Sequence, residues 1–285
     1  MSDLYPVPDA FAAQANVTRA DYERDYAESV RDPDAFWGRI AKRLEWMTPP
    51  ARIRDVSFDR QNFQIRWFAD GELNASVNCL DRHLATRGDK TALIFEPDGP
   101  DAAPQHISYR ELHARVCRFG NALRNLGVGK GDRVTIYLPM IVEAAVAMLA
   151  CARIGAIHTV VFGGFSSNSI ADRVRDSSAK LIITADEGLR GGKKVPLKAN
   201  VDAALKLPGT SSVETVLVVR HTGGAVDMQM PRDRWYDAVV EGQPDTCEPE
   251  RMNAEDPLFI LYTSGSTGKP KGVLHTTGGY LLFAS

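Results

Sequence analysis

The sequence has 285 residues, 44% hydrophobic and 25% charged, which is ordinary for a globular protein and excludes disordered and fibrous classes. Its 34 lysines and arginines nearly balance 36 aspartates and glutamates, and this excludes a broad basic surface for nucleic acid or an anionic membrane. Any phosphate group must therefore be bound locally.

The beginning of the chain and the cysteines predict a cytoplasmic protein. Residues 1–6 lack the basic start of a signal peptide, and the apolar stretch 144–152 is shorter than the roughly 20 residues that span a bilayer. The four cysteines lie far apart without metal-binding spacing, so we expect reduced thiols. Neither export nor membrane insertion is expected.

The N-terminal part is predicted to be helical and then extended. Residues 21–46 have the pattern of an amphipathic helix interrupted at Asp32-Pro33-Asp34, and residues 56–68 alternate between apolar and polar positions. We interpret residues 1–75 as an N-terminal extension and residues 76–285 as the first part of an α/β domain.

A strand and helix alternation follows a short helix predicted at residues 77–87. Strands are predicted at residues 91–95, 133–138, 156–162, 180–185 and 213–219, and helices at residues 109–126, 141–154, 167–176 and 197–205. Ser108 and Glu111 form a capping box before the first of these helices, and residues 141–154 are apolar nearly all round, which predicts a deeply buried helix. Repeated βα units predict an α/β fold with a mostly parallel sheet flanked by helices.

A long connection precedes the most informative segment. Residues 221–255 are rich in glycine, proline and acidic residues, with one short helix expected near residues 235–240. Residues 257–262 then predict a buried strand, and residues 273–275 form a second apolar stretch. A glycine-rich loop lies between the two.

This loop has the composition of a phosphate-binding site. Its residues are Thr263, Ser264, Gly265, Ser266, Thr267, Gly268, Lys269, Pro270, Lys271 and Gly272. Glycines let backbone N–H groups approach phosphate oxygens, hydroxyl groups add donors, and lysines neutralise charge, although such runs also occur as flexible linkers. A Walker loop is disfavoured, because Thr263 stands where its first glycine is needed and Pro270 where its serine or threonine is needed.

The loop resembles the signature loop of the adenylate-forming superfamily, which includes acyl-CoA synthetases, luciferases and peptide-synthetase adenylation domains. The resemblance implies that residues 263–269 and Lys271 grip the β- and γ-phosphates of ATP while a carboxylate attacks the α-phosphorus. Acyl-AMP and pyrophosphate would form, with Lys271, Thr263 and Thr267 as catalytic residues that stabilise the leaving pyrophosphate.

Further segments resemble the acetyl-CoA synthetases and their propionyl and acetoacetyl relatives. These segments are residues 34–37 (DAFW), 67–74 (WFADGELN) and 78–83 (NCLDRH). Taken alone, Asp81, Arg82 and His83 are also explained as a solvated helix face.

Two more loops match this family at positions that imply coenzyme A contacts. Arg190, Gly191, Gly192 and Lys193 follow a predicted parallel strand, and the resemblance implies that they contact the nucleotide phosphates of coenzyme A. Lys193 stands where the family often has a second arginine, so its contact would be a point charge rather than a fork. The alternative for residues 190–193 is a solvated basic turn. Gly163 and Gly164 (in FGGFS) would lie near the coenzyme A path, and the alternative for them is a strand-to-helix turn capped by Ser166 or Ser167.

The resemblance as a whole implies an incomplete N-terminal domain of an AMP-forming acetate–CoA ligase. The substrates would be acetate, ATP and coenzyme A, with Mg²⁺ ligands and the acyl pocket outside this chain, so we expect no turnover by the chain alone. A propionyl- or acetoacetyl-CoA synthetase, or a non-catalytic nucleotide-binding module, remains the alternative. No histidine is assigned a catalytic role, and no pattern indicates the oligomeric state.

Overall fold

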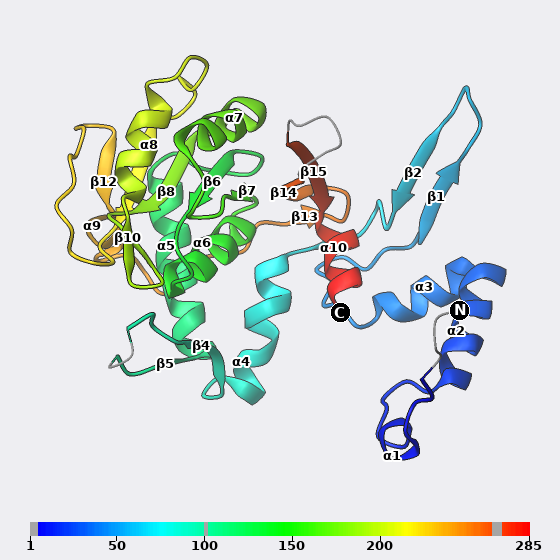
Figure 1. Ribbon diagram of the computed structural model, residues 1–285. Coiled ribbons are helices and arrows are strands. Elements are labelled where there is room, and N and C mark those ends of the chain that lie inside the picture. The colour runs from blue at the N-terminus through cyan, green and yellow to red at the C-terminus, as the bar shows by residue number, and fades with distance from the viewer. Residues whose placement is uncertain (1–4, 100–101, 264–269) are drawn as a thin grey trace.

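The structure, a computed structural model, describes residues 5–99, 102–263 and 270–285. Its centre is a seven-stranded sheet in the order β12-β11-β8-β6-β7-β14-β15 (Figure 1). Neighbouring strands are parallel except for β14 and β15, which are antiparallel. The strands are β6 (Arg133–Tyr137), β7 (Ile157–Val160), β8 (Leu181–Ala185), β11 (Thr215–Val219), β12 (Asp233–Trp235), β14 (Pro257–Thr263) and β15 (Lys271–Thr276). The predicted α/β class with a mostly parallel sheet is confirmed.

Helices cover both faces of this sheet. The chain passes from β6 to β7 and then returns beyond β6 to β8, so right-handed crossovers place their helices on opposite faces. One face carries α5 (Tyr109–Asn125), α6 (Val142–Arg153) and α9 (Tyr236–Val240); the other carries α7 (Ser167–Ser177) and α8 (Leu197–Leu205). No residue of α6 is exposed, as its apolar sequence predicted, and every residue of β8 is buried.

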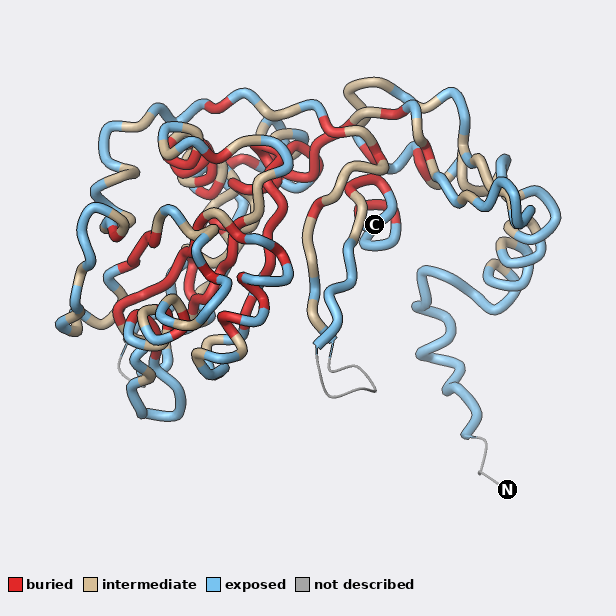
Figure 2. Tube along the Cα trace, turned by 90° about the horizontal axis from the view of Figure 1, so that it is seen from above, coloured by how far each residue is buried: buried red, intermediate tan, exposed pale blue. Residues whose placement is uncertain are grey.

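The N-terminal part extends from this body as helices and a hairpin. Its elements are α1 (Asp9–Ala12), α2 (Arg19–Arg31), α3 (Pro33–Ala41), β1 (Arg54–Ser57) and β2 (Gln64–Trp67). Asp32 separates α2 from α3, and its carboxylate accepts a hydrogen bond from the Ala35 N–H at 3.1 Å, so the predicted interruption is confirmed. Figure 2 shows this part mostly in the colour of exposed residues, and α2 has no buried residue.

Shorter elements connect the extension to the body and decorate its edges. They are β3 (Glu72–Leu73), the π-helix η1 (Val77–Asp81), α4 (Arg82–Arg87), β4 (Thr91–Phe95), β5 (Gln105–Ser108), β9 (Gly188–Arg190), β10 (Lys193–Val195), β13 (Met252–Asn253) and α10 (Thr277–Ala284). The capping box of Ser108 and Glu111 is present at the start of α5.

Two predictions for this part of the fold are wrong. The strand at residues 91–95 exists, but it pairs antiparallel with β5 in a separate sheet, because no crossover helix lies between the two strands. The long connection at residues 221–255 contains strands β12 and β13 in addition to the expected short helix. These strands are too short for a hydrophobic period to reveal them.

The strands beside the glycine-rich loop are also less buried than predicted. Residues of β14 are mostly half-buried, and four of the six residues of β15 are exposed, including Val273 and Leu274. The reason is position, because β15 is the edge strand of the sheet and α10 lies only near its end. Apolar sequence did not distinguish an edge hairpin from a central strand.

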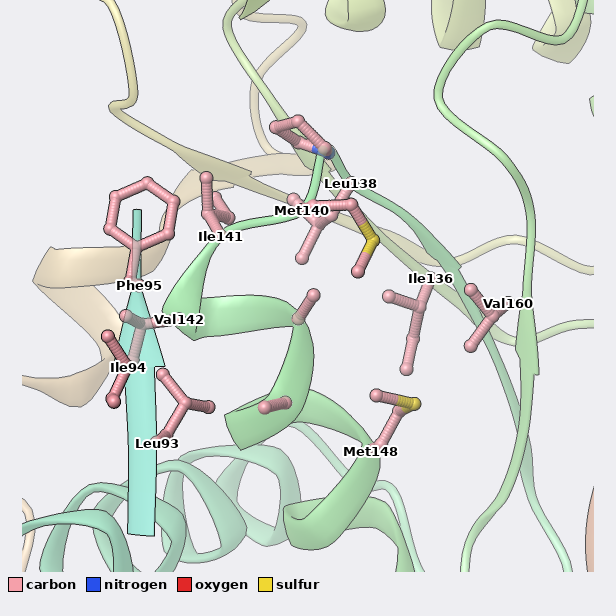
Figure 3. A pocket seen from close by; sticks show the side chains of 13 residues that line it. Leu93, Ile94, Phe95, Ile136, Leu138, Met140, Ile141, Val142, Met148 and Val160 are labelled. Atoms are coloured by element: carbon pink, nitrogen blue, oxygen red, sulfur yellow. The ribbon is translucent and has the colours of Figure 1, made fainter. Parts of the chain in front are cut away.

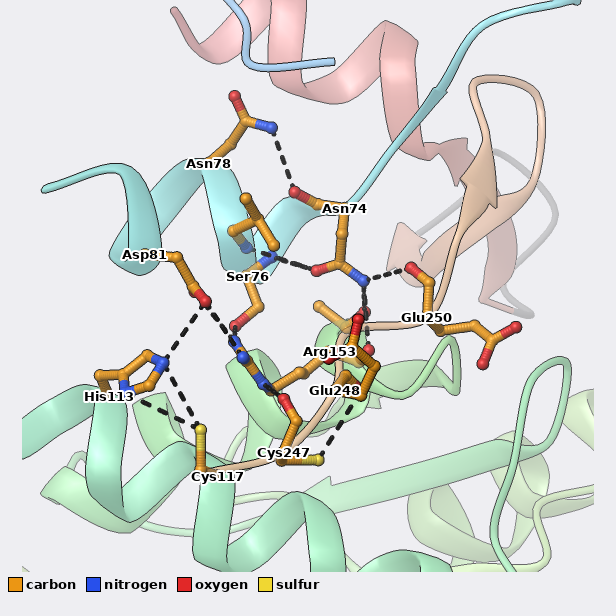
Figure 4. Close-up of polar contacts among 12 residues, drawn as sticks. Asn74, Ser76, Asn78, Asp81, His113, Cys117, Arg153, Cys247, Glu248 and Glu250 are labelled. Carbon is orange, nitrogen blue, oxygen red and sulfur yellow. Dashed lines mark hydrogen bonds and ion pairs between the residues drawn. The ribbon is translucent and has the colours of Figure 1, made fainter. Parts of the chain in front are cut away.

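A polar cluster joins residues 74–81 to the end of α6 and to residues 247–250 (Figure 4). The Asn74 amide nitrogen donates to the carbonyl groups of Ala152, Arg153 and Glu250 at 2.9–3.1 Å. The buried Arg153 guanidinium donates to both carboxylate oxygens of Asp81 at 2.9 and 3.0 Å. Asp81 is therefore an ion-pair partner rather than part of a solvated helix face.

Candidate functional site

The predicted phosphate loop closes the β14–β15 hairpin. Thr263 and Lys271 are paired across the hairpin in register, and both are exposed. The other predicted loop residues, Ser264, Gly265, Ser266, Thr267, Gly268 and Lys269, lie outside the described residues. The two ends of the loop therefore lie side by side at the tip of a solvent-facing hairpin.

The stem of this hairpin is hydrogen-bonded to α7. The Tyr262 hydroxyl donates to Asp176 Oδ2 at 2.6 Å. Burial and the neighbouring Asp176 carboxylate raise the pKa of Tyr262, so the hydroxyl stays protonated and remains a donor. Gly272 pairs with Tyr262, and a Cβ at this glycine would lie 3.2 Å from the same Asp176 oxygen and 3.0 Å from Ile260. The glycine therefore leaves room for the bond.

A cavity of about 340 Å³ lies between α7 and the stem. Its lining residues, which combine cations, carboxylates and an aromatic ring, are Asp172, Arg173, Arg175, Asp176, Tyr262 and Pro270. No sequence pattern indicated this cavity, because its residues come from segments almost a hundred positions apart.

The Gly163-Gly164 turn and Arg190 come together in space. The Arg190 guanidinium carbon lies 5.0 Å from the centroid of the Phe162 ring. A Cβ at Gly164 would lie 3.0 Å from Arg190 Nη1 and 2.6 Å from the Phe162 ring, so a larger residue would require these side chains to move. Two loops that the sequence indicated separately thus form one group.

Tyr137 forms hydrogen bonds with the carbonyl groups of this turn. Its hydroxyl donates toward the carbonyl oxygens of Gly163 and Phe165 at 3.2 and 2.8 Å. Burial raises the pKa of Tyr137, which keeps the hydroxyl protonated. Ser166 then caps α7, so the strand-to-helix turn is present. The sequence analysis missed Tyr137, because an apolar strand gives no sign of where a hydroxyl points.

Gly191 and Gly192 form the tip of the β9–β10 hairpin. Their φ angles are +56° and +75°, the left-handed values that a two-residue hairpin turn needs. Arg190 and Lys193 are paired at the two ends of the turn. The Gly192 N–H donates to Asp98 Oδ2 at 3.2 Å, so this amide already has a partner. The hairpin presents its two cations at an exposed tip.

The predicted cations differ from their neighbours in electrostatic environment. Within the described residues, Arg190, Lys193 and Lys271 form no ion pair, whereas Lys194 pairs with Glu187 at 2.7 Å. No hydrogen bond or ion pair between described residues joins the Arg190 hairpin to the Thr263–Lys271 stem. The structure therefore shows two separate groups of available donors.

An apolar cavity of about 200 Å³ opens beside the carboxyl end of β6 (Figure 3). It lies between β4, the start of α6 and the end of β7, and its most exposed lining residues are Met140 and Ile94. Carboxyl ends of parallel strands are the usual ligand-binding edge of such sheets. None of its lining residues is titratable, so it offers shape and apolar surface only.

The described part of the chain has neither a metal-binding cluster nor a membrane-spanning helix. No group of three or more His, Cys, Asp or Glu side chains there is arranged to hold a metal ion. In the same residues, no helix has both the length and the apolar character to cross a bilayer.

Comparison with known families assigns the class. The family described as AMP-binding enzyme matches residues 80–285, and the family described as acetyl-coenzyme A synthetase N-terminus matches residues 22–79. Because the first match alone covers more than half of the chain, the chain belongs to the AMP-binding enzyme family.

Particular relatives agree with this class. Acetyl-coenzyme A synthetase of Xanthomonas axonopodis is 76% identical over the whole chain, which covers 44% of that protein, and the Xylella fastidiosa enzyme is 70% identical with the same coverage. The solved structure of acetoacetyl-CoA synthetase from Streptomyces lividans matches with a TM-score of 0.82 at 27% identity, covering 95% of this chain and 40% of that one. The chain spans less than half the length of the relatives it matches.

Proposed function

We propose that this chain supplies the phosphate loop and coenzyme A contacts of an AMP-forming acetate–CoA ligase. The reaction converts acetate, ATP and coenzyme A into acetyl-CoA, AMP and pyrophosphate through acetyl-adenylate. Identity of 76% to a protein named acetyl-coenzyme A synthetase supports acetate over acetoacetate, whose named synthetase is 27% identical.

The observation that carries the proposal is the set of exposed cations without ion-pair partners in the described residues. Lys271 lies beside Thr263 at the hairpin tip, where its ammonium group can approach a phosphate without first leaving a carboxylate. With Thr263 and Thr267, it would hold the β- and γ-phosphates and stabilise the negative charge that develops on departing pyrophosphate. The amides and hydroxyls of residues 264–266, 268 and 269 would complete the grip.

The second group of donors is proposed to bind coenzyme A. Arg190 offers a planar fork for two phosphate oxygens, whereas Lys193 offers a point charge from the paired position. Gly163 and Gly164, next to Arg190, would let the extended chain of coenzyme A pass close to the backbone. Gly191 and Gly192 fix the spacing of the two cations.

Several finer parts of the proposal concern the whole enzyme. Mg²⁺ would neutralise phosphate charge, with ligands outside this chain, and the reaction is proposed to be cytoplasmic. Propionate and acetoacetate remain the alternative acyl substrates, since the residues proposed here contact phosphates rather than the acyl group. The chain alone is expected to be inactive.

A chimaera tests this proposal. This chain would replace the matching 44% of the Xanthomonas axonopodis enzyme, and acetate-dependent exchange between ATP and pyrophosphate would be measured. We expect exchange with the chimaera and none with this chain alone. A folded chimaera that activates no short carboxylate would contradict the proposal.

Two substitutions in the chimaera separate the two groups of donors. Lys271→Ala should slow ATP–pyrophosphate exchange by about 100-fold, as expected for a group that stabilises transition-state charge, and should spare thioester formation from supplied acetyl-AMP. Arg190→Ala should leave exchange unchanged, because exchange needs no coenzyme A, and should raise the KM for coenzyme A about tenfold. Equal loss in both half-reactions for either variant would contradict its assignment.

A further inference from the structure

Arg173 on α7 is a buried cation without a carboxylate partner among the described residues. It is 5% exposed, and its Nη1 donates to the Ser169 carbonyl at 2.7 Å. Burial lowers the pKa of Arg173, which reflects the cost of removing a charged guanidinium from water. Such a cost calls for compensation from the surroundings.

Two aromatic faces supply this compensation. The Arg173 guanidinium carbon lies 4.9 Å from the ring centroid of Phe165 and 5.1 Å from that of Tyr262. Both distances lie within the range of a cation–π interaction, which is strongest when the cation is desolvated. Arg173 therefore bridges two rings from separate segments of the chain.

The two rings belong to the two predicted binding groups. Phe165 follows the Gly163-Gly164 turn and packs edge to face on Phe162 at 5.6 Å, and Phe162 carries Arg190 on its face. Tyr262 directly precedes Thr263 in β14. A series of contacts between cations and aromatic rings therefore connects the coenzyme A group to Tyr262, the residue before Thr263. In order, the side chains are Arg190, Phe162, Phe165, Arg173 and Tyr262.

We propose that Arg173 is a positioning residue that sets the Tyr262–Thr263 end of β14 relative to the Gly163-Gly164 turn. This inference rests on the proposed function for the identity of the two ligands, but the mechanical link stands on the contacts alone. A planar guanidinium between two rings resists displacement of either one, which an ammonium group on a flexible stem would not do. A substitution at Phe165 should therefore change the mobility of Thr263, because Arg173 contacts both Phe165 and Tyr262, the residue before Thr263.

Hydrogen exchange on this chain tests the link without any ligand. Phe165→Leu and Arg173→Met should each speed amide exchange at Tyr262, Thr263 and Lys271 about tenfold. Arg175→Met is the matched control on the same helix, because Arg175 pairs with Asp172 and, among the described residues, it is Arg173 that lies over the two rings; it should leave these amides unchanged. Unchanged exchange in the Phe165→Leu chain would overturn the inference.

Steady-state kinetics of the chimaera provide a second test. The measured quantity is the KM for ATP, which a residue with a purely structural role would leave unchanged. Phe165→Leu should raise the KM for ATP about fivefold, which corresponds to a typical coupling free energy between two positions. In a chimaera that already carries Arg173→Met, Phe165→Leu should have no further effect on this KM. Arg173→Lys should behave like Arg173→Met, since it keeps the charge but loses the planar group. Additive effects of the two substitutions would overturn the inference.

Different results would contradict the proposed function and the proposed role of Arg173. If Lys271→Ala and Arg190→Ala leave both half-reactions unchanged, the proposed function is wrong, and hydrogen exchange still decides the role of Arg173. If those variants behave as expected and the Phe165 effect is additive with Arg173→Met, only the role of Arg173 is wrong.

Discussion

The central strands and the β14–β15 hairpin belong to one sheet and have similarly apolar sequences, but they differ in burial. All five residues of β8 are buried between helix layers, whereas Leu261, Val273 and Leu274 of the hairpin are 43–51% exposed. The difference follows from position in the sheet, because helices cover the centre on both faces and the hairpin forms the edge. The exposed edge carries the loop that we assign to ATP, as expected where connecting loops bring function to a rigid scaffold.

The largest expected effect is the difference in stability loss when one apolar side chain is truncated in the central sheet and one in the hairpin. Ile182→Ala in β8 should lower the free energy of unfolding by about 3 kcal/mol, because it leaves a cavity in a fully buried site. Leu274→Ala in β15 should cost less than about 1 kcal/mol, because this side chain is already half exposed. Urea denaturation of both variants measures the difference, and equal losses would contradict the proposed division.

A pH-dependent effect of intermediate size is expected in the body. Hydrogen bonds to Asp81 and Cys117 raise the pKa of His113 to about 9, from an unfolded value near 6.5. Because the folded pKa is the higher one, this stabilisation is complete below about pH 6.5 and is lost as the pH rises through about 9. The expected loss is about 2 kcal/mol, less than the full shift implies, because both side chains keep some contact with solvent.

His113→Asn is the control for this titration. Urea denaturation between pH 6 and 9.5 should show a smaller decline in the variant than in the unsubstituted chain. The comparison is needed because burial also raises the pKa of Cys151 and Cys247, and these thiols ionise more readily once unfolded. Parallel curves for both proteins would show that His113 does not contribute.

The smallest effect is expected where the hairpin meets α7. Tyr262→Phe removes the hydrogen bond to Asp176 and should lower stability by about 0.5–1 kcal/mol, the net value of one such bond. Tyr280→Phe is a matched control, since the Tyr280 hydroxyl has no hydrogen bond to a described residue, and it should be nearly neutral. A loss above about 2 kcal/mol for Tyr262→Phe would mean that the hairpin is held as firmly as the central strands.

Local sequence patterns predicted much of the fold. The capping box of α5 and the interruption at Asp32-Pro33 depend on residues three or four positions apart, and both are present. The strand at residues 91–95 was assigned to the wrong sheet, because its apolar pattern specifies extension but not a partner. Tyr137, Arg173 and Asp176 were missed, because each has a partner 26–89 positions away along the chain: Gly163 for Tyr137, and Tyr262 for Arg173 and Asp176.

The sequence by itself determined the order and type of most elements and the chemistry of two loops, because hydrophobic period, capping and turn residues act over a few positions. It also carried the resemblance that the family comparison confirmed. Only the tertiary structure decided that Gly164 lies against Arg190, that Arg173 lies between Phe165 and Tyr262, and that the β14–β15 hairpin is an exposed edge. These contacts depend on strand order and on which helix covers which face, and neither is encoded in neighbouring residues.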